Sequence, residues 1–366
     1  MIGVAIIGLG AALAPHAKAL QDMADRVRVV HAVAGNAGRR RSVAELYGFP
    51  VSADAAAAIA DPGVDAVMIL TPTNAHLEIA EAAFAAGKHV LCEKPLETTL
   101  ARAERLVALG RRADRRLAVM LQLRFRAASQ RLKTLLEAGK LGEIQAATMT
   151  VPWWRPQSYY DEPGRGVMAR DGGGVLMIQA IHTLDLFRWC VGISAVEASI
   201  VRTTSLHKME TEDYATALVH LGNGSPGSIV ATVAAFPGGP EQIMVIGSQG
   251  TARMEGSSLR VSFLHGTEDV VQDGGPSGSG SGFMAFSHEP HKAVISDFLD
   301  AIEQGRDPAI PGEEALATQR VIDTIINTTR HRHDYQQRSV NDAKSAAIGR
   351  TTRRSSEGAG RNDRYR

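Results

Sequence analysis

The sequence predicts an α/β protein, with an N-terminal doubly wound domain on a parallel sheet and a second α+β domain on a large, mainly antiparallel open sheet. Short β-branched runs alternate with alanine-rich stretches over residues 1–123, which is the pattern of βαβ units. From residue 124 onward, strands follow one another with turn signals between them. At 366 residues, 44% of them apolar, the chain is long enough for two cores.

Apolar, β-branched runs mark the strands of the first domain, which we place at residues 1–123. They occupy residues 4–8, 27–35, 66–70, 89–93 and 117–121. Helical patterns lie between them, for example at 42–48 and 75–88. Gly87 ends the second of these helices, as a glycine often does.

The second domain is predicted to span residues 124–335. A helix over 126–142 precedes strands near 143–154, 196–205, 213–221, 227–236, 242–247 and 251–263. The glycine- and serine-rich segment 274–282 predicts a flexible loop, and two amphipathic helices follow at 290–304 and 313–331. We expect the last helix to pack back toward the first domain, and the polar, basic residues 336–366 to form a disordered tail.

Charge and cysteine content narrow the class of partner. The 40 basic and 39 acidic side chains almost cancel, which disfavours nucleic acid and anionic membrane surfaces. Cys92 and Cys190 are too few for a disulfide framework or a closed zinc site, so no metal is expected. No secretory leader or membrane-spanning run opens the chain. We therefore expect a cytoplasmic protein that binds a small molecule.

A glycine-rich turn follows the first strand directly and precedes a helix. Gly8 and Gly10 would let the backbone approach a pyrophosphate, and the helix N-terminus would offer free N–H groups to it. Leu13 replaces the third glycine of the dinucleotide fingerprint, which is expected to loosen the packing of helix on strand. The alternative is a tight turn without a ligand. The residues expected to hold a dinucleotide here are Gly8, Leu9, Gly10, Ala11 and Ala12.

The end of the second strand bears on the choice between NAD and NADP. An acidic residue at this point binds the ribose 2′-hydroxyl of NAD, but this chain has Asn36, with Arg39 and Arg40 in the next turn. A neutral amide beside arginines favours the 2′-phosphate of NADP. The alternative is that these arginines are ordinary surface residues at the start of a helix.

Polar residues follow the next two strands at the carboxyl edge of the sheet, where open α/β folds bind ligands. Thr71, Pro72, Asn74 and His76 follow one strand, and Glu93 and Lys94 follow the next. A lysine before a proline is held in a restricted direction. Apolar walls and a cationic nicotinamide ring would lower the pKa of Lys94, so that its amine could take or give a proton.

A second group of candidate residues follows a glycine triplet at 172–174. We expect the triplet to lead into a helix that carries Gln179, His182 and Asp185 on one face. A lone histidine in such a helix is more often a hydrogen-bonded core residue. The nearby amide, carboxylate and glycines favour a functional role for His182 here.

These motifs together resemble the Gfo/Idh/MocA oxidoreductase family. The matching segments read GLGAALAPH at 8–16, TPTNAH at 71–76, GKHVLCEKP at 87–95 and GGGVLMIQAIHTLD at 172–185, and the resemblance extends over about residues 1–335. It implies a Rossmann domain that binds NAD or NADP, and a second domain whose open sheet covers the active site. It also implies a homodimer or homotetramer formed through the outer face of that sheet.

The resemblance further implies roles for two residues. Lys94 would be the acid/base at the substrate hydroxyl or carbonyl, and His182 its assistant or the proton carrier. Many sugar and cyclitol dehydrogenases of the family have an aspartate four residues before the histidine, where this chain has Ile178. The inositol dehydrogenase mechanism therefore does not transfer directly, and Gln179 is expected to contact substrate or nicotinamide instead.

Aromatic and basic residues precede the glycine triplet. Stacking surfaces with arginines suit a sugar, a sugar acid or an aromatic carboxylate, although a packed crossover or a subunit contact is an equal alternative. Gln122, placed with the cofactor, and Arg124 are expected near the same site. The residues expected to bind substrate are Gln179, Arg124, Tyr160, Arg165 and Asp185.

The sequence thus predicts an NAD(P)-dependent dehydrogenase or reductase. It would transfer hydride between nicotinamide and a secondary alcohol or ketone of a sugar, polyol, sugar acid or cyclic diol, with NADP favoured. One alternative is an enzyme that retains its cofactor through a redox cycle, such as a glycosidase or a sugar–sugar oxidoreductase. The other is a non-catalytic dinucleotide sensor, which an intact Lys94 argues against.

Overall fold

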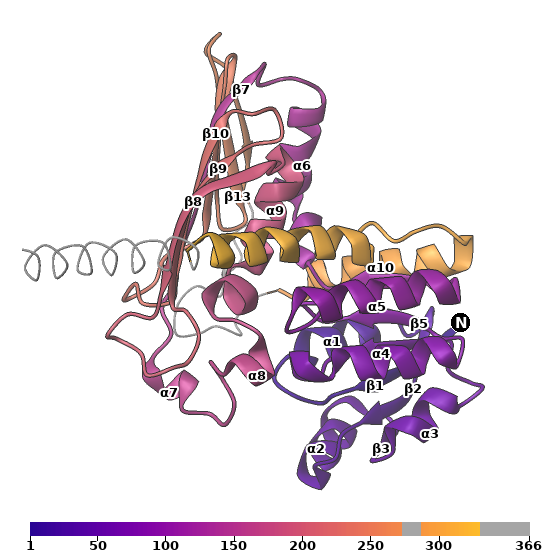
Figure 1. Cartoon of the computed structure of the whole chain (residues 1–366). Helices are drawn as coiled ribbons and strands as arrows, with labels where there is room; N and C mark the ends of the chain where they lie inside the picture. The colour runs from indigo at the N-terminus through magenta and orange to yellow at the C-terminus, as the bar shows by residue number, and fades with distance from the viewer. Residues whose placement is uncertain (273–286, 330–366) are drawn as a thin grey trace, which may run out of the picture.

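The computed structural model describes residues 1–272 and 287–329, which form two domains (Figure 1). The boundary predicted near residue 123 lies in the short helix η2 (Gln122–Phe125), where the chain passes from one sheet region to the next. The predicted loop at 274–282 and the predicted tail at 336–366 fall outside the described residues.

The first domain is the expected parallel sheet, with strand order β3-β2-β1-β4-β5-β6. Every residue of β1 is buried, because helices cover both faces of such a sheet. The two-residue edge strand β3 was not predicted. The strands are β1 (Ile2–Ile7), β2 (Val27–Val33), β3 (Val51–Ser52), β4 (Ala66–Ile69), β5 (His89–Cys92) and β6 (Leu117–Val119).

The helices of this domain have sequence-encoded ends. The side chains of Asn36 and Thr99 accept backbone N–H groups at the start of α2 and α5, and Gly48 ends α2 in the left-handed region. Both caps fix the direction in which the chain leaves the sheet. The helices are α1 (Leu13–Asp22), α2 (Ala37–Tyr47), α3 (Ala55–Ala60), η1 (Thr73–Ala75), α4 (His76–Ala85) and α5 (Leu100–Ala113).

The second domain contains an eight-stranded sheet with the order β14-β13-β12-β11-β7-β10-β9-β8. It is antiparallel except where β10 pairs parallel with β7. The single strand predicted at 251–263 is two strands joined by a turn at Gly256, and β14 was missed. The strands are β7 (Ile144–Pro152), β8 (Ala195–Arg202), β9 (Tyr214–His220), β10 (Pro226–Thr232), β11 (Gln242–Gly247), β12 (Gly250–Glu255), β13 (Ser258–Phe263) and β14 (Glu268–Val271).

Helices α6 (Ala127–Glu137) and α9 (Ile181–Val191) pack on one face of this sheet (Figure 1). Burial alternates along the strands accordingly: in β9, Ala215, Ala217 and Val219 are buried, whereas Leu218 is exposed on the opposite face. The connection from β7 to α9 carries the short elements α7 (Gln157–Tyr160), α8 (Met168–Asp171) and the π-helical turn η3 (Val175–Gln179).

The chain then returns to the first domain. In α10 (Glu289–Gln304), Asp300 and Ser296 accept hydrogen bonds from Arg26, at 2.6 and 3.0 Å, beside α1. The helix at 312–329, yellow in Figure 1, bonds to both domains: Gln319 donates to Glu97 O at 2.6 Å, and Ile325 O accepts from Ser199 at 2.6 Å. The described part of the last helix therefore contacts both domains.

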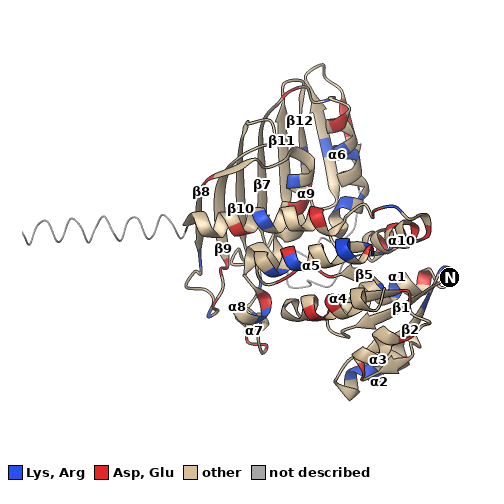
Figure 2. Cartoon of the chain, turned by 45° about the vertical axis from the view of Figure 1, so that its right-hand side comes forward, with Lys and Arg blue, Asp and Glu red and all other residues tan. Residues whose placement is uncertain are grey.

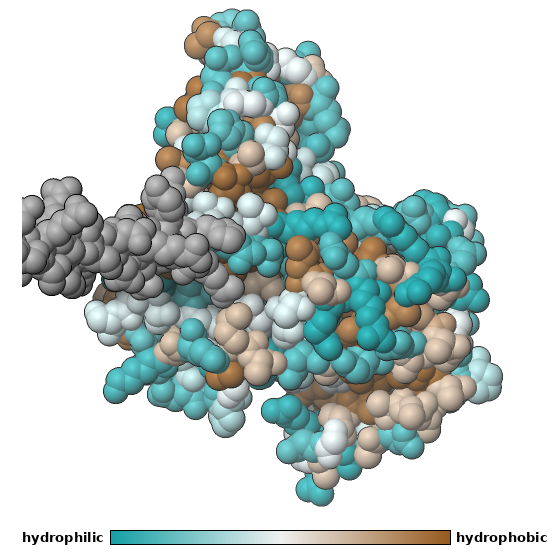
Figure 3. Space-filling model, viewed as in Figure 1, coloured by the Kyte–Doolittle hydropathy of each residue, from teal (hydrophilic) through white to brown (hydrophobic). Residues whose placement is uncertain are grey.

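The surface is mixed in charge and polarity. Basic and acidic residues alternate along the helices in Figure 2, in line with the net charge of +1. In the view of Figure 3, apolar residues form separate areas between polar ones. Among the described residues, no helix is long and apolar enough to cross a membrane.

Candidate active site

The glycine turn after β1 lies at the carboxyl edge of the parallel sheet. Gly8 has φ +107°, and a Cβ there would lie 2.6 Å from Leu70 O, so the turn packs directly on the end of β4. A Cβ on Gly10 would have nothing within 4 Å, which leaves that backbone open to a ligand. Leu13 is buried in the core, so the residue at the third glycine position packs between helix and sheet rather than loosening them.

The end of β2 offers no carboxylate to a ribose. The side-chain oxygen of Asn36 accepts the backbone N–H of Arg39 at 2.9 Å, and Arg40 donates to Ala34 O at 2.6 Å and to Gly35 O at 2.9 Å. Arg39 is exposed. The guanidinium of Arg40 therefore lies against the end of β2, next to the position expected for the adenosine ribose.

Lys94 connects the two domains. It follows β5, its bond to Pro95 is cis, and its ammonium donates to Ile178 O of η3 at 2.7 Å. Burial lowers the pKa of Lys94, and the charge of Arg155 also lowers it, while Glu93 and Asp171 oppose the shift. The ammonium thus lies where the end of the parallel sheet meets the turn that leads into α9.

Glu93 holds the backbone of Lys94. One carboxylate oxygen pairs with His16 Nε2 at 2.7 Å, and the other accepts the Lys94 backbone N–H at 3.1 Å. Burial acts to raise the pKa of Glu93, but the hydrogen bond from His16 and nearby positive charges outweigh it and bring the pKa to about 2. His291 on α10 stacks edge-on against His16, with ring centres 5.2 Å apart. Ligand atoms of these three side chains lie within 4.8 Å of one another, a donor set that a metal ion could also use.

His76 has a different role from the expected one. It was predicted to line the cofactor site, but its ring is buried, with Nε2 3.0 Å from Thr71 O and Nδ1 3.0 Å from Pro95 O. These contacts join the loops that follow β4 and β5. His76 therefore positions the Thr71 and Lys94 segments, whereas Pro72 and Asn74 in the same loop are exposed.

The glycine triplet allows two close backbone approaches. A Cβ on Gly172, which has φ +75°, would lie 2.4 Å from Thr98 Cα, and a Cβ on Gly174 would lie 1.8 Å from Glu212 O. Glu212 accepts the N–H groups of Gly174 and Leu176 at 2.9 and 3.1 Å. The triplet therefore fastens the start of η3 to the first domain on one side and to β9 on the other.

The predicted helix face is divided by the π turn. Gln179 ends η3, and His182 lies in the first turn of α9. Among the described residues, Gln179 Oε1, His182 Nδ1 and Gln122 Oε1 are buried without a hydrogen-bond partner. Burial lowers the pKa of His182 well below its usual range, and the charge of Lys94 lowers it further. A neutral imidazole close to Lys94 can accept or donate a proton.

Two predicted substrate residues form a structural ion pair. Arg124 donates to both carboxylate oxygens of Asp185 at 2.7 Å, and both side chains are buried. Thr318 also donates to Asp185, and Glu314 accepts from Arg124 at 3.0 Å. Because the carboxylate of Asp185 is saturated by these bonds, its contacts favour a role in joining η2, α9 and the last helix.

Tyr160 and Arg165 lie in the aromatic segment before the triplet. The Arg165 guanidinium is 4.0 Å from the ring centre of Tyr159, and that of Arg155 is 5.3 Å from the ring centre of Trp153. Tyr160 is buried, and its hydroxyl has no hydrogen-bond partner among the described residues. This segment is therefore built from aromatic rings that hold two guanidinium groups.

Sequence reasoning missed three residues of this region. The charge of Asp171 acts to raise the pKa of Lys94, His16 pairs with Glu93, and Glu97 accepts the Leu77 N–H at 3.0 Å. Asp171 directly precedes the glycine triplet, which was the available signal for it. His16 and Glu97 showed no such signal, because their burial is visible only in the fold.

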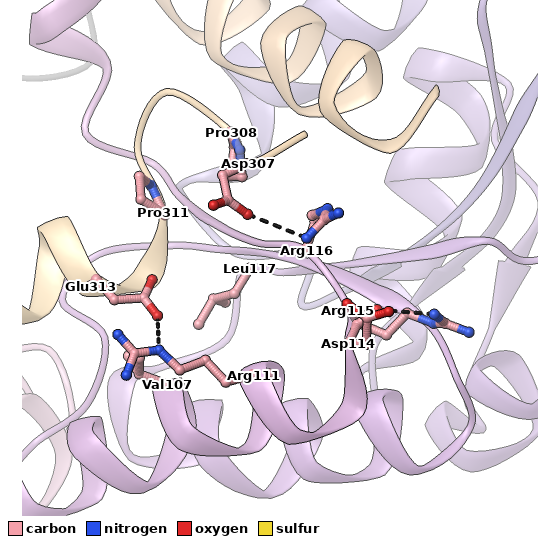
Figure 4. Close-up of a pocket in the computed structure, with 11 residues that line it drawn as sticks. Val107, Arg111, Asp114, Arg115, Arg116, Leu117, Asp307, Pro308, Pro311 and Glu313 are labelled. Atoms are coloured by element: carbon pink, nitrogen blue, oxygen red, sulfur yellow. Dashed lines mark hydrogen bonds and ion pairs between the residues drawn. The ribbon is translucent and has the colours of Figure 1, made fainter. Parts of the chain in front are cut away.

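A cavity of about 210 Å³ lies elsewhere on the first domain (Figure 4). It is lined by the end of α5, the start of β6 and residues 307–313. Its arginines are already paired: Arg111 bonds to Glu313, and Arg116 to Asp307 at 3.2 Å. Because it faces the amino end of β6, it lies at the opposite edge of the sheet from Lys94.

Comparisons with known proteins agree with this geometry. Residues 2–121 match the model of an oxidoreductase family with an NAD-binding Rossmann fold, and residues 129–253 match the GFO/IDH/MocA C-terminal domain. The chain is 27% identical to the myo-inositol 2-dehydrogenase of Thermotoga maritima, over 85% of this chain and 91% of the relative. It is 36% identical to an inositol 2-dehydrogenase of Streptomyces avermitilis, over 55% and 57%.

A solved structure gives the same result. The WlbA dehydrogenase from Bordetella pertussis, in complex with NADH and UDP-GlcNAcA, superimposes with a TM-score of 0.77 at 27% identity. The superposition covers 90% of this chain and 96% of that one. Both domains of the fold are therefore shared with a dehydrogenase that binds NADH.

Proposed function

Because the chain belongs to the Gfo/Idh/MocA oxidoreductase family, we propose that it transfers hydride between a nicotinamide dinucleotide and a secondary alcohol or ketone of a sugar, polyol, sugar acid or cyclic diol. Its relatives include inositol 2-dehydrogenases and a dehydrogenase bound to NADH and a UDP-sugar. The family membership supports the reaction class, and the residues of the site support the roles given below.

The position of Lys94 carries this proposal. Its ammonium lies at the carboxyl edge of the parallel sheet and donates to Ile178 O in the second domain. The open backbone of Gly10 lies at this same edge. Its pKa is lowered by burial. A lysine used only for a surface turn would be solvated, whereas this one bonds to the residue before Gln179. The Gln179 oxygen and His182 Nδ1 are buried and have no partner in the described part of the chain.

The proposed proton transfer uses Lys94 directly. During oxidation, the neutral amine would accept the hydroxyl proton of the substrate as the carbon loses hydride and becomes a carbonyl, and bound cofactor would supply the hydride acceptor. Reduction reverses both transfers. His182, which is neutral, then exchanges a proton with the Lys94 ammonium, and the Gln179 amide fixes the orientation of the substrate oxygen.

The residues around the two loops fit a dinucleotide. The backbone from Gly8 to Ala12 would hold the pyrophosphate, and Thr71, Pro72 and Asn74 would lie along the nicotinamide ribose. Bound cofactor would supply the hydride acceptor or donor. Gln122, whose side-chain oxygen is buried without a partner among the described residues, would contact the nicotinamide amide.

We propose NADP as the preferred form. Asn36 offers no negative charge at the end of β2, and Arg39 and Arg40 lie in the first turn of α2. The 2′-phosphate would bind the exposed guanidinium of Arg39, while Arg40 keeps its bonds to the backbone of β2. The WlbA dehydrogenase from Bordetella pertussis binds NADH, so the preference rests on these residues of the present chain alone.

We also propose a homodimer or homotetramer. The face of the eight-stranded sheet opposite α6 and α9 exposes Ile200 and Leu218, at 57% and 56% of their surface. Neighbouring positions on this face, including Met244 and Ile246, are only half-buried. A second copy covering this face would bury apolar side chains on both subunits.

A Lys94→Met variant tests the catalytic part of the proposal. The variant removes the amine and keeps the length and apolar character of the side chain. We expect kcat to fall by about 10²- to 10⁴-fold, which is the contribution of general acid–base catalysis. Binding of the reduced cofactor, measured by nicotinamide fluorescence, should remain within about threefold of the wild type. Full turnover in the variant would overturn the role of Lys94.

A further inference from the structure

We infer that the substrate of this site carries an anionic group, a carboxylate or a phosphate, and that the guanidinium group of Arg165 binds it. The inference rests on the proposed dehydrogenase function and names the class of compound that the same site takes. It follows from the charges that meet around Lys94 and from the way in which two arginines are held there.

The two arginines are close enough to Lys94 to share its electrostatic environment. Burial and, to a smaller extent, the charge of Arg155 lower the pKa of Lys94. Burial mainly lowers the pKa of Arg155, and the charge of Arg165 adds to this. The charges of Lys94 and Arg165 both act to lower the pKa of Asp171. Three cationic side chains from the two domains therefore influence one another's charge in this region.

Both guanidinium groups are held before any substrate arrives. Arg165 stacks at 4.0 Å on the ring of Tyr159, and Arg155 lies over Trp153 and donates to Trp154 O at 2.8 Å. Only 5% of the surface of Arg155 is exposed. Planar guanidinium groups fixed on aromatic rings lose little entropy when they bind an oxyanion.

Unused donors remain beside these groups. Arg165 Nη1 is buried, and it has no hydrogen-bond partner among the described residues; the same is true of the Tyr160 hydroxyl. Tyr160 is 8% exposed. An unpaired, buried donor is costly, so a ligand oxygen that accepts from both would recover this energy.

The acidic residues Asp171 and Glu162 leave Nη1 of Arg165 without a partner among the described residues. Asp171 accepts the Gly166 N–H at 2.8 Å and lies 3.9 Å from Arg170, and burial raises its pKa. Glu162 pairs with Arg165 Nη2 at 2.9 Å, but it is 60% exposed, so solvent screens it. A carboxylate or phosphate can therefore approach Nη1 of Arg165 while Nη2 keeps its partner.

Matched sugars test the inference. With the preferred oxidised cofactor at saturation, kcat/KM would be measured for D-glucose, D-glucuronate and D-glucose 6-phosphate, and for D-galactose and D-galacturonate. We expect at least one anionic member to exceed its neutral parent by about 10- to 100-fold, the effect of one charge-assisted hydrogen bond. Preference for the uronates identifies a carboxylate site, and preference for the sugar phosphate a phosphate site.

Two variants then test whether Arg165 causes the preference for an anionic substrate. Arg165→Met should reduce the anionic-to-neutral ratio of kcat/KM to near one, and Glu162→Gln should raise that ratio, because it removes the competing carboxylate. Arg131→Met, at an exposed ion pair on α6, is the control and should leave the ratio unchanged. A ratio near one in the wild type would overturn the inference while leaving the dehydrogenase function standing.

The inference stays testable if no sugar of the panel is oxidised. Calorimetric titration of the enzyme saturated with reduced cofactor would compare D-glucuronate, D-glucose 6-phosphate and D-glucose. Tighter binding of an anion, lost in Arg165→Met, supports the anionic site even without turnover. Equal or weaker binding of both anions contradicts it.

Discussion

In the proposed mechanism, the protonation state of Lys94 decides whether it can accept or donate the proton. An amine that accepts a proton must be neutral, and burial lowers the pKa of Lys94 below that of an ordinary lysine. His182 next to it is neutral over the physiological range, because burial and the charge of Lys94 lower its pKa well below the usual value. The change of charge that accompanies proton transfer is therefore assigned to the lysine.

This assignment predicts a pH profile. In the oxidative direction, kcat/KM should rise with pH and level off above the pKa of Lys94, because only the neutral amine accepts the proton. In the reductive direction, it should fall over the same range, because only the ammonium donates. Initial rates in buffers of constant ionic strength would show both midpoints. Oxidation that is fastest at acidic pH would contradict the role of Lys94.

A second prediction at this scale concerns Asn36. Aspartate caps a helix as well as asparagine does, so Asn36→Asp should keep the start of α2 while placing a carboxylate at the ribose. The ratio of dissociation constants for NADPH and NADH should rise by about tenfold, or about 1.4 kcal/mol, through repulsion of the 2′-phosphate. Fluorescence titration measures both constants, and an unchanged melting temperature is the check on folding.

An unchanged ratio in Asn36→Asp would mean that this end of β2 does not contact the 2′-position. Arg39→Gln provides the complementary test, because it removes the exposed guanidinium without adding a charge. Arg39→Gln should weaken the binding of NADPH and leave the binding of NADH unchanged.

At the scale of elements, the glycine triplet connects the site to both domains. Gly172 combines a left-handed backbone with close contact to Thr98, and η3 begins immediately after the triplet. Glu212 binds the N–H groups at the start of this turn. The position of Ile178 O, and with it the Lys94 ammonium, depends on how the triplet packs.

Gly172→Ala tests this dependence. Both Gly172 and Gly48 have a left-handed φ, but a Cβ on Gly48 would meet nothing within 4 Å. Gly48→Ala should therefore lower the free energy of unfolding by only about 1–2 kcal/mol, the cost of a left-handed backbone at a residue with a Cβ. Gly172→Ala should cost more and also reduce kcat. Urea denaturation and turnover would be measured for both, and equal losses in the two variants would show that contact with Thr98 is unimportant.

Much of the fold was predictable because the spacing of apolar residues along the sequence indicates which positions are buried. The strands of the first domain showed continuous apolar runs, and the helix at 126–142 and the later strands before residue 250 showed periodic patterns; all are present. The two-residue β3 is too short to leave a pattern, and the turn at Gly256 did not interrupt the pattern of its flanking strands.

The site was only partly predictable, because a side chain's partners depend on tertiary packing. Lys94 was identified from its position after a strand, since the ends of parallel strands share one edge. Arg124 and Asp185 were assigned to substrate from their residue type, but they lie close enough to bond to each other. They are separated by 61 positions in the sequence, which gives no signal for this pairing.

For the whole molecule, the uncovered face of the eight-stranded sheet bears on assembly. Sedimentation should give a mass that is two or four times the 39.0 kDa of the chain. Leu218→Lys, on this face, should shift the equilibrium toward the monomer, whereas a lysine at the exposed Leu46 of α2 should not. A wild-type mass of one chain at micromolar concentration would contradict the proposed assembly.

Hydride transfer itself is the central claim, and one measurement tests it most directly. The protein would be incubated with oxidised NADP and then NAD, and with each member of a panel of polyols, sugars, sugar acids and cyclic diols, while the absorbance of the reduced nicotinamide is followed. We predict turnover on one class of compound, lost in Lys94→Met. Cofactor that binds tightly without any turnover on the panel, or no cofactor binding at all, would contradict the account.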